Sequence, residues 1–563
     1  MKNKYKSLIG LALTAPLLMT TGCIEETFPN NSVTQDQLAG SSKATEALVW
    51  GMASNMNTYF TLGSINNRHF DFGNPALIHA RDVMTEDMSV QYGGGYDWFS
   101  SWSALTVSMD PLYTVPPFMW NFYYTQVLAC NNCIGAVDKN TTDTNMLNYL
   151  GTGYAFRAAT YLDLARTFEF LPNANTTPTN GVTGLTVPIV TEETTEEQAR
   201  NNPRAPHNEM VAFIKGDLEK AIECFRGSGA ARMGKTLPDL AVAYGLMARL
   251  YLWDASYCDP TYNSASNIHA GDSEGKSTEL YKEAARYAEL AITASKATPL
   301  TRNEWTNTVS GFNDPSVSSW MWAQQYVAED GAVQSGIINW ASFVVNEQTF
   351  GYTSAGAWVM IGTSLYDQIS DRDFRKLSWI APEGAPLSGQ EPVLNAEFAA
   401  KNLEEYYAIK FRPGSGNMDD PKVGAAVGVP LMRVEEMYMI QAEALEHTAP
   451  GQGIAKLQDF MKNYRYATYR PTKGDNIEEI ILQKRIELWG EGQTFFDVKR
   501  LNMSVTRAYD GSNFEYGRNT YNTQGRPYWM NLVIPDQETR NNAQILGKNN
   551  PSIVEVMTPV SSK

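Results

Sequence analysis

Apolar residues spaced three and four positions apart are the feature that most constrains the fold of this chain. This spacing places apolar side chains on one face of a helix, and it recurs along much of the sequence. Short polar or Gly- and Pro-containing connections join many of the periodic segments in pairs, which predicts helical hairpins that stack on one another. The predicted helical segments are residues 42–59, 118–137, 146–170, 209–225, 240–256, 280–295, 431–447, 454–464 and 476–501.

Two of these segments carry small and aromatic residues in a regular order. Residues 241–253 and 281–292 share the Ala/Gly-then-aromatic rhythm of tetratricopeptide (TPR) repeats, in which each helical hairpin buries its apolar face against the next. Small residues allow the paired helices to approach closely. We therefore predict a mainly α fold, in which a TPR-like scaffold of about four helical hairpins is accompanied by minor β structure.

Two long segments lack helical periodicity. Residues 61–117 and 301–425 are rich in Gly, Asn, Ser and aromatic residues and contain only short strand-like runs such as 320–327. Loops of this length inside a compact protein usually carry function. We predict a single domain over residues 41–563, with two loop-rich, ligand-facing regions (61–117 and 301–425) on a helical scaffold formed by residues 41–60, 118–297 and 430–502.

The N-terminus has the pattern of an export signal. Lys2, Lys4 and Lys6 precede an apolar run that is too short to span a bilayer, and Thr20-Thr21-Gly22-Cys23 follows it. A small residue directly before Cys23 resembles a bacterial lipobox. Residues 1–22 are therefore interpreted as a lipoprotein signal peptide, Cys23 as the lipidated first residue of the mature chain, and residues 23–40 as a polar tether. A plain secretory signal is the alternative.

Charge and one short motif bear on nucleic acids and nucleotides. Lys and Arg total 45 against 61 Asp and Glu, which gives a net charge of −16 and argues against a nucleic-acid partner. Residues 229–236, GAARMGKT, fit the phosphate-loop pattern. A phosphate loop follows a strand, whereas the amphipathic helix 209–225 precedes this motif. We predict a connector between helices, with Lys235 in solvent and no bound nucleotide.

The sequence points to no catalytic residue, metal or cofactor. The five His residues include no H-E-x-x-H pair. Cys130 and Cys133 have the spacing of metal ligands, but both lie inside the helical segment 118–137, which favours buried structural thiols.

The C-terminal third resembles the SusD/RagB family of outer-membrane nutrient-binding lipoproteins. Residues 478–501 are similar to the signature helix pair of that family, although Gln493-Thr494 stands where a basic residue is common. Residues 153–168, Val187-Pro188, Lys410-Phe411-Arg412 and residues 431–445 resemble further family elements in chain order. The signature residues are Arg485, Glu487, Leu488, Glu491, Gly492, Asp497 and Arg500.

The charges of the signature have a structural interpretation. Glu487 and Glu491 are four residues apart and would repel each other on one helix unless cations such as Arg500 neutralise them. We interpret these residues as partly buried ion pairs that lock two helices together, not as catalytic groups.

The resemblance implies a SusD-like fold and a non-catalytic protein, anchored to the outer membrane and facing the cell exterior. It would capture oligosaccharides and pass them to a SusC-like TonB-dependent transporter. Peptide capture, as in RagB-type members, is the alternative, and a secreted glycan hydrolase with a carboxylate pair is a remote one.

Exposed aromatic residues are the expected sugar contacts, because the C–H faces of sugar rings pack on aromatic rings. Core packing is the alternative for each of them, and it is favoured for Trp320 and Trp358, which apolar residues flank. The predicted ligand-binding residues are Tyr92, Tyr96, Asp97, Trp98 and Trp102 in the first loop-rich region and Trp340 and Tyr352 in the second.

Overall fold

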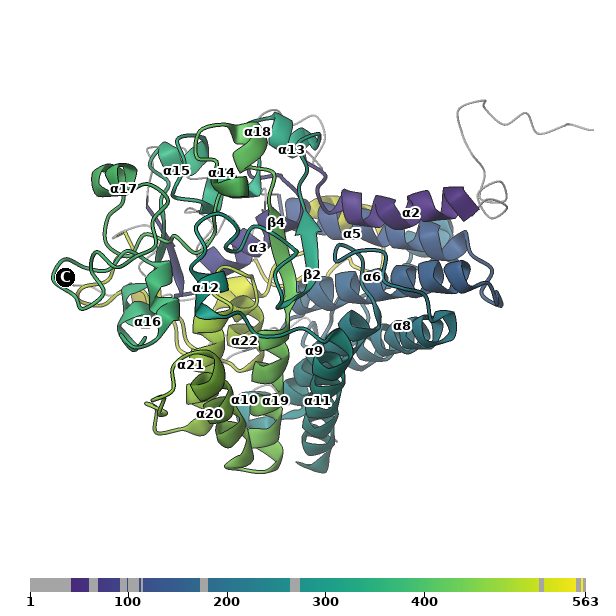
Figure 1. Cartoon of the computed structure of the whole chain (residues 1–563). Coiled ribbons are helices and arrows are strands. Elements are labelled where there is room, and N and C mark those ends of the chain that lie inside the picture. The colour runs from purple at the N-terminus through teal and green to yellow at the C-terminus, as the bar shows by residue number, and fades with distance from the viewer. Residues whose placement is uncertain are drawn as a thin grey trace, which may run out of the picture.

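Long helices pack side by side across the molecule in the computed structural model (Figure 1), which confirms the mainly α prediction. The residues that it describes are 42–59, 69–91, 99, 111–112, 115–172, 181–263, 274–515, 521–552 and 558–559. The long helices are α2 (Ser42–Asn55), α5 (Val115–Gly135), α6 (Thr144–Phe168), α8 (His207–Ser228), α9 (Leu240–Cys258), α11 (Glu274–Ser295), α19 (Val434–Thr448) and α20 (Gln452–Tyr464). The shorter helices α21 (Asn476–Glu487) and α22 (Thr494–Arg500) follow α20 in the chain.

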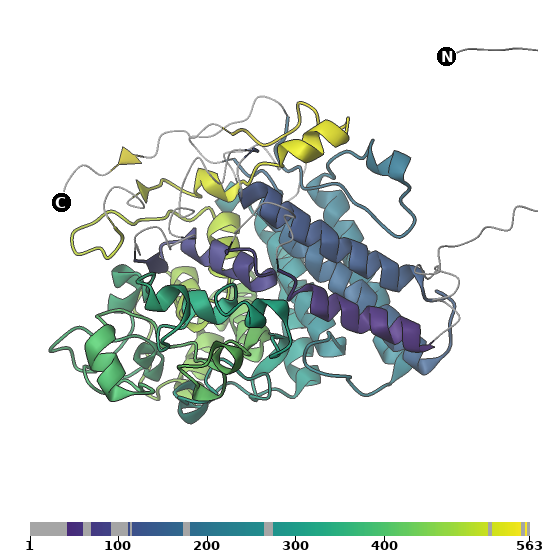
Figure 2. The ribbon, with the colours of Figure 1, turned by 90° about the horizontal axis from the view of Figure 1, so that it is seen from above.

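Each long helix packs on its neighbour in the chain. Helix α5 packs on α6, α6 on α8, α8 on α9 and α9 on α11, and the row continues through α19 to α20 and α21. Figure 2 shows the purple helix α2 lying along α5 at the start of this row. Within the described residues, no helix is both long and apolar enough to cross a bilayer. The predicted signal peptide, Cys23 and the tether lie outside the described residues.

Helix α6 shows why small residues recur in the scaffold. Asp143 caps its N-terminus, where its carboxylate accepts hydrogen bonds from the N–H groups of Asn145 and Met146. A Cβ atom at Gly151 would lie 3.0 Å from Cys224 Cβ of α8, and one at Gly153 would lie 2.9 Å from Ile134 Cγ1 of α5. These two glycines therefore let α5 and α8 approach α6 from different sides.

The remaining elements are short. They include the 3₁₀ turns η3 (Phe374–Ser378), η4 (Gly414–Gly416) and η5 (Tyr528–Met530). The short helices are α3 (Asn74–Val83), α7 (Glu196–Ala199), α10 (Pro260–Asn263), α12 (Arg302–Trp305), α13 (Gly331–Gln334), α14 (Trp340–Val344), α15 (Gly351–Ser354), α16 (Thr363–Asp367), α17 (Ala396–Asn402), α18 (Pro421–Gly424) and α23 (Asp536–Asn541).

The strands of the described residues form antiparallel two-stranded pairs. Strand β1 pairs with β3, β2 with β4, and β5 with β6. Strand β2 confirms the strand expected near residues 320–327. The strands are β1 (Met88–Val90), β2 (Trp320–Gln325), β3 (Val359–Ile361), β4 (Gly428–Arg433), β5 (Tyr521–Asn522) and β6 (Thr558–Pro559).

Three segments differ from expectation. The segment predicted as a helix from residue 431 begins as strand β4, because residues 428–433 pair with β2, and α19 starts only at Val434. The segment 476–501 breaks between α21 and α22, where Gly490 and Gly492 both have positive φ. In the first loop-rich region, α3 is buried along its whole length and β1 is also buried, so most of residues 74–90 belong to the core and not to an open loop.

Buried ion pairs hold the C-terminal helices together, as the signature predicted. The carboxylate of Glu487 lies between the guanidinium groups of Arg375, Arg433 and Arg465, at N–O distances of 3.0, 3.2 and 2.7 Å. Arg433 also pairs with Glu491 at 2.9 Å. Arg500 was expected to neutralise Glu487 and Glu491, and this prediction is wrong.

Arg500 pairs with Glu443 at 2.6 Å and with Asp497 at 2.8 Å, because α22 turns away after the break and carries it to another part of the core. The charges near Glu487 come instead from segments that are distant in the sequence.

A buried histidine joins three helices of the scaffold. His207 begins α8, and its ring lies 2.7 Å from Glu169 Oε1 at the end of α6 and 3.2 Å from Asp254 Oδ1 in α9. Burial disfavours the charged imidazole, but Glu169 and Asp254 outweigh it and raise the pKa of His207 from 6.5 to about 9. Imidazolium is therefore the form that holds this junction together at neutral pH.

The His207 junction is expected to make stability depend on pH. Its contribution is present in full below the unfolded pKa of 6.5 and is lost as the pH rises through about 9. Relative to His207→Gln, the wild type should lose about 2–3 kcal/mol of unfolding free energy over this window. Urea unfolding of both proteins at each pH measures the difference, and parallel pH profiles would contradict the assignment.

Candidate functional site

An open hollow lies beside the β1–β3 pair. Val90 pairs with Val359, and Met360 forms a bridge to Tyr407, so three segments distant in the sequence meet at one edge. The hollow has a volume of about 820 Å³, large enough for a small oligosaccharide-sized ligand. Its lining residues are Val90, Gln91, Met360, Ile380, Ala381, Glu383, Ser388, Leu403, Glu404, Glu405, Tyr406, Tyr407, Asn513 and Glu515.

Two stacked aromatic rings lie at the base of the hollow. Tyr407 stacks on Trp358, with ring centroids 5.3 Å apart and the planes 23° from parallel. Gln91 ties these rings to β1, because its N–H donates to the carbonyl of Trp358 at 2.9 Å and its side chain bonds the hydroxyl of Tyr407. Trp358 is half-buried. Tyr407 is itself 2% exposed, so this stacked pair supports the floor from beneath.

Tyr406 presents a second, half-exposed ring in a strained backbone conformation. Its φ of 70° lies in the left-handed region, which non-glycine residues rarely adopt. Two backbone bonds hold it there: its N–H donates to Ile380 O at 2.7 Å, and its carbonyl accepts from the Ile361 N–H at 3.2 Å. The ring packs edge-on against Tyr366. Strain of this kind often marks functional sites.

The rim of the hollow is polar. The side chains of Glu383, Glu404, Glu405 and Glu515 are exposed, and Asn513 lies half-buried among them. Carboxylates accept hydrogen bonds, and amides both donate and accept. An apolar floor with such a rim suits a ligand that has flat C–H faces and many hydroxyl groups.

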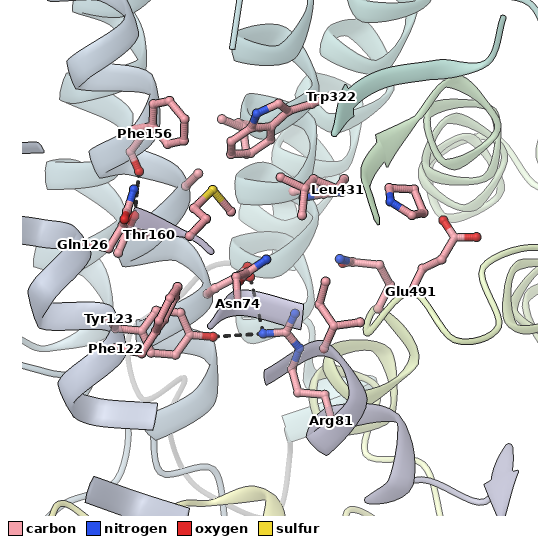
Figure 3. Close-up of a pocket in the computed structure, with 18 residues that line it drawn as sticks. Asn74, Arg81, Phe122, Tyr123, Gln126, Phe156, Thr160, Trp322, Leu431 and Glu491 are labelled. Atoms are coloured by element: carbon pink, nitrogen blue, oxygen red, sulfur yellow. Dashed lines mark hydrogen bonds and ion pairs between the residues drawn. The ribbon is translucent and has the colours of Figure 1, made fainter. Parts of the chain in front are cut away.

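A second cavity lies inside the scaffold (Figure 3). Arg81 projects into it from α3 and donates to Tyr123 Oη at 2.9 Å, and it lies 3.5 Å from Asp163. The volume is only about 50 Å³, enough for a few water molecules but not for a sugar ring. This cavity is therefore part of the buried polar packing between α3, α5 and α6.

The predicted ligand-binding residues divide into two groups. Those of the first region, Tyr92, Tyr96, Asp97, Trp98 and Trp102, lie outside the described residues, and their role stays a prediction.

The two residues of the second region are in the core, which corrects the expectation for them. Trp340 is 1% exposed and packs edge-on against Phe411. Tyr352 is 4% exposed and stacks on Phe343 with ring centroids 4.5 Å apart. Neither ring face is free to receive a sugar. Trp320, for which the sequence favoured core packing, is 1% exposed.

Sequence reasoning missed Tyr406 and Tyr407. It favoured core packing for Trp358, which is half-buried and stacks on the buried ring of Tyr407. The pair of tyrosines follows two glutamates, a pattern that could have indicated an aromatic surface with acceptors beside it. The backbone strain at Tyr406 has no signal in the sequence.

The GAARMGKT segment is a connector between α8 and α9, as predicted. Gly229 ends α8 in the left-handed conformation, and the carboxylate of Asp239 caps α9. Lys235 is not in solvent, however. It is half-buried, and its Nζ donates to the carbonyl of Val317 at 2.6 Å, while its own carbonyl accepts from the Ala323 N–H in β2. Lys235 therefore anchors the connector to β2.

The cysteine thiols of α5 lie in the core, as expected for structural residues. Cys130 and Cys133 are buried free thiols, and burial raises the pKa of both, so neither is a reactive thiolate at neutral pH. Across the described ranges, no group of three or more His, Cys, Asp or Glu side chains is arranged to hold a metal ion.

Solved structures share the fold of this chain. A SusD-like carbohydrate binding protein from Bacteroides vulgatus is 21% identical with a TM-score of 0.68, and the alignment covers 91% of this chain and 98% of that one. A laminarin binding SusD-like protein is 16% identical with a TM-score of 0.58, covering 91% and 99%. Surface glycan-binding protein A from Bacteroides fluxus is 16% identical with a TM-score of 0.60, covering 91% and 100%.

Family models match consecutive parts of the sequence. No curated protein matches the chain significantly. The SusD-like model described as "Starch-binding associating with outer membrane" matches residues 76–252, and the model described as "SusD family" matches residues 293–552. Proteins of this family are associated with the outer membrane. The two matched segments follow each other over most of the chain, which belongs to the SusD/RagB family.

Proposed function

We propose that this protein is a surface-exposed, lipid-anchored glycan binder that captures oligosaccharides without cleaving them. The open hollow with the half-exposed ring of Tyr406 on its floor and hydrogen-bonding groups on its rim carries the proposal. Family members are binding proteins and generally non-catalytic, and two solved relatives are named for laminarin and surface-glycan binding. The lipobox-like sequence before Cys23 supports the lipid anchor, and the family resemblance supports transfer to a SusC-like TonB-dependent transporter.

The geometry indicates how a sugar would bind. The half-exposed ring of Tyr406 offers a flat apolar surface to the C–H face of one sugar unit. Rim carboxylates accept hydrogen bonds from its hydroxyl groups, and the amides of Gln91 and Asn513 both donate and accept. Because Gln91 directly precedes Tyr92 in the sequence, we further propose that Tyr92, Tyr96, Asp97, Trp98 and Trp102 contribute to ligand capture.

Replacing Tyr406 with glycine tests the role of the hollow. Loss of the ring should weaken oligosaccharide binding about tenfold, since stacking and the apolar area it buries contribute on the order of 1–1.5 kcal/mol. The fold should tolerate the change, because glycine adopts a φ of 70° without the penalty of about 1–2 kcal/mol that tyrosine carries there. Calorimetry with a panel of oligosaccharides that includes laminari-oligosaccharides measures the affinity.

Trp50→Ala is the matched control. Trp50 is an exposed aromatic residue of α2. Figure 1 shows α2 on the opposite side of the molecule from α17, so the loss of Trp50 should leave binding unchanged. Equal affinities of the Tyr406→Gly protein and the wild type would contradict the proposed site. Binding of oligopeptides alone would favour the peptide-capturing alternative, and release of sugar products would show that the protein is an enzyme.

A further inference from the structure

Among the described residues, the charged side chains on the rim of the hollow are all acidic. Glu383, Glu404, Glu405 and Glu515 line it, and its described lining contains no Lys, Arg or His. All four carboxylates are exposed. A ligand in the hollow would therefore meet acceptor oxygens and a negative potential from several sides.

Cations do not balance these charges. None of the four glutamates forms an ion pair with another residue in the described part of the chain, whereas the buried glutamates of the scaffold do. Glu405 accepts a hydrogen bond from the backbone N–H of Glu383 at 3.0 Å. This bond joins two walls of the hollow but leaves the negative charge in place.

The rim carboxylates also act on the tyrosines of the hollow. Burial and the adjacent carboxylate of Glu404 raise the pKa of Tyr407. Burial, together with the charges of Asp367 and Glu405, raises the pKa of Tyr406. The same carboxylates that disfavour ionisation of these tyrosines also disfavour a further negative charge in the hollow beside them.

We infer that the hollow selects uncharged or amino-bearing saccharides and rejects those that carry uronate or sulfate groups, with Glu383, Glu404, Glu405 and Glu515 as the specificity-determining residues. This inference rests on the proposed function. Hydroxyl and ammonium groups donate hydrogen bonds to carboxylates. A uronate or sulfate group in the hollow offers only acceptors and faces the like charges of the four glutamates that line it.

Paired saccharide probes test this selectivity. Calorimetry would compare neutral oligosaccharides with uronate, sulfated and amino-bearing oligosaccharides of the same length. At low salt, the anionic probes should bind the wild type about tenfold more weakly than their neutral counterparts. The gap should narrow as salt rises from about 0.01 to about 1 M, because the Debye length falls from about 30 to about 3 Å.

A charge-neutralising variant assigns the effect to the rim. Glu404→Gln/Glu405→Gln keeps side chains of the same shape, and a glutamine at 405 can still accept the Glu383 N–H. Its affinity for uronate probes should rise several-fold relative to neutral probes. Glu223→Gln/Glu478→Gln changes the net charge equally at exposed positions on α8 and α21, and it should leave that ratio unchanged.

The outcomes separate this inference from the proposed function. A wild type that prefers anionic saccharides would overturn the selectivity alone and leave glycan capture standing. An equal ratio in both double variants would overturn the role assigned to Glu404 and Glu405. A wild type that binds no saccharide of any charge would overturn the proposed function, and the selectivity with it.

Discussion

Replacing Glu487 with alanine is expected to lower the free energy of unfolding by about 3–5 kcal/mol, because it leaves buried cations without their counter-charge. The Glu487 side chain is fully buried and touches Arg375, Arg433 and Arg465. Arg433 would keep Glu491 as a partner, and Arg375 would keep Asp373. Arg465 would lose its closest carboxylate, since Glu435 is 3.5 Å away.

Glu478→Ala provides the control for Glu487→Ala. Glu478 lies on the same helix, α21, but its side chain is exposed. Its replacement should change the unfolding free energy by no more than about 0.5 kcal/mol. Urea unfolding followed by circular dichroism compares the three proteins. Similar midpoints for Glu487→Ala and Glu478→Ala would show that the cluster contributes little net stability.

Gly490→Ala is expected to cost about 3 kcal/mol, although it adds a single methyl group. Gly490 has a φ of 77°, and a Cβ atom there would lie 2.5 Å from the Phe411 ring. The substitution therefore combines backbone strain with a clash in a packed core. It would also push apart α21 and the segment that carries Lys410, whose Nζ donates to the carbonyl of Trp489 at 2.7 Å.

Gly474→Ala is the control for Gly490→Ala. No heavy atom lies within 4 Å of a Cβ atom at Gly474, and its φ is not in the left-handed region. Alanine there should leave stability unchanged or raise it by up to about 1 kcal/mol, since it restricts the unfolded chain. Thermal unfolding of both variants measures the contrast, and an unfolding temperature for Gly490→Ala equal to that of Gly474→Ala would contradict the strain argument.

The helices could be predicted because their signal is local. The apolar spacing between residues 146 and 170 placed α6 within two residues of Thr144–Phe168, and the same held for α8 and α9 at their N-termini. The prediction of helices failed where the apolar spacing continues but tertiary structure turns the chain or extends it. Between α21 and α22 the apolar residues continue, but Gly490 and Gly492 turn the chain, and in β4 the pairing with β2 decides the conformation.

The candidate site could not be predicted in the same way. Its walls come from residues near 90, 360, 405 and 513, and nothing in their local sequence shows that they meet. Trp340 and Trp358 illustrate the limit. Both lie in the same aromatic-rich region, yet Trp340 begins a buried helix and Trp358 stacks beside the hollow. Which ring faces the core depends on tertiary packing, not on neighbours in the sequence.

The pairing of β2 with β4 has a consequence for how such proteins diversify. Gln325 at the end of β2 and Gly428 at the start of β4 are register partners. The segment between them, residues 326–427, therefore begins and ends at the same place beside the helical scaffold. The free energy of closing a loop grows only with the logarithm of its length. Changes of length in the exposed turns of residues 326–427, which supply most of the hollow's walls, should therefore cost little, whereas Arg375 and Lys410 keep the segment tied to Glu487 and Glu491.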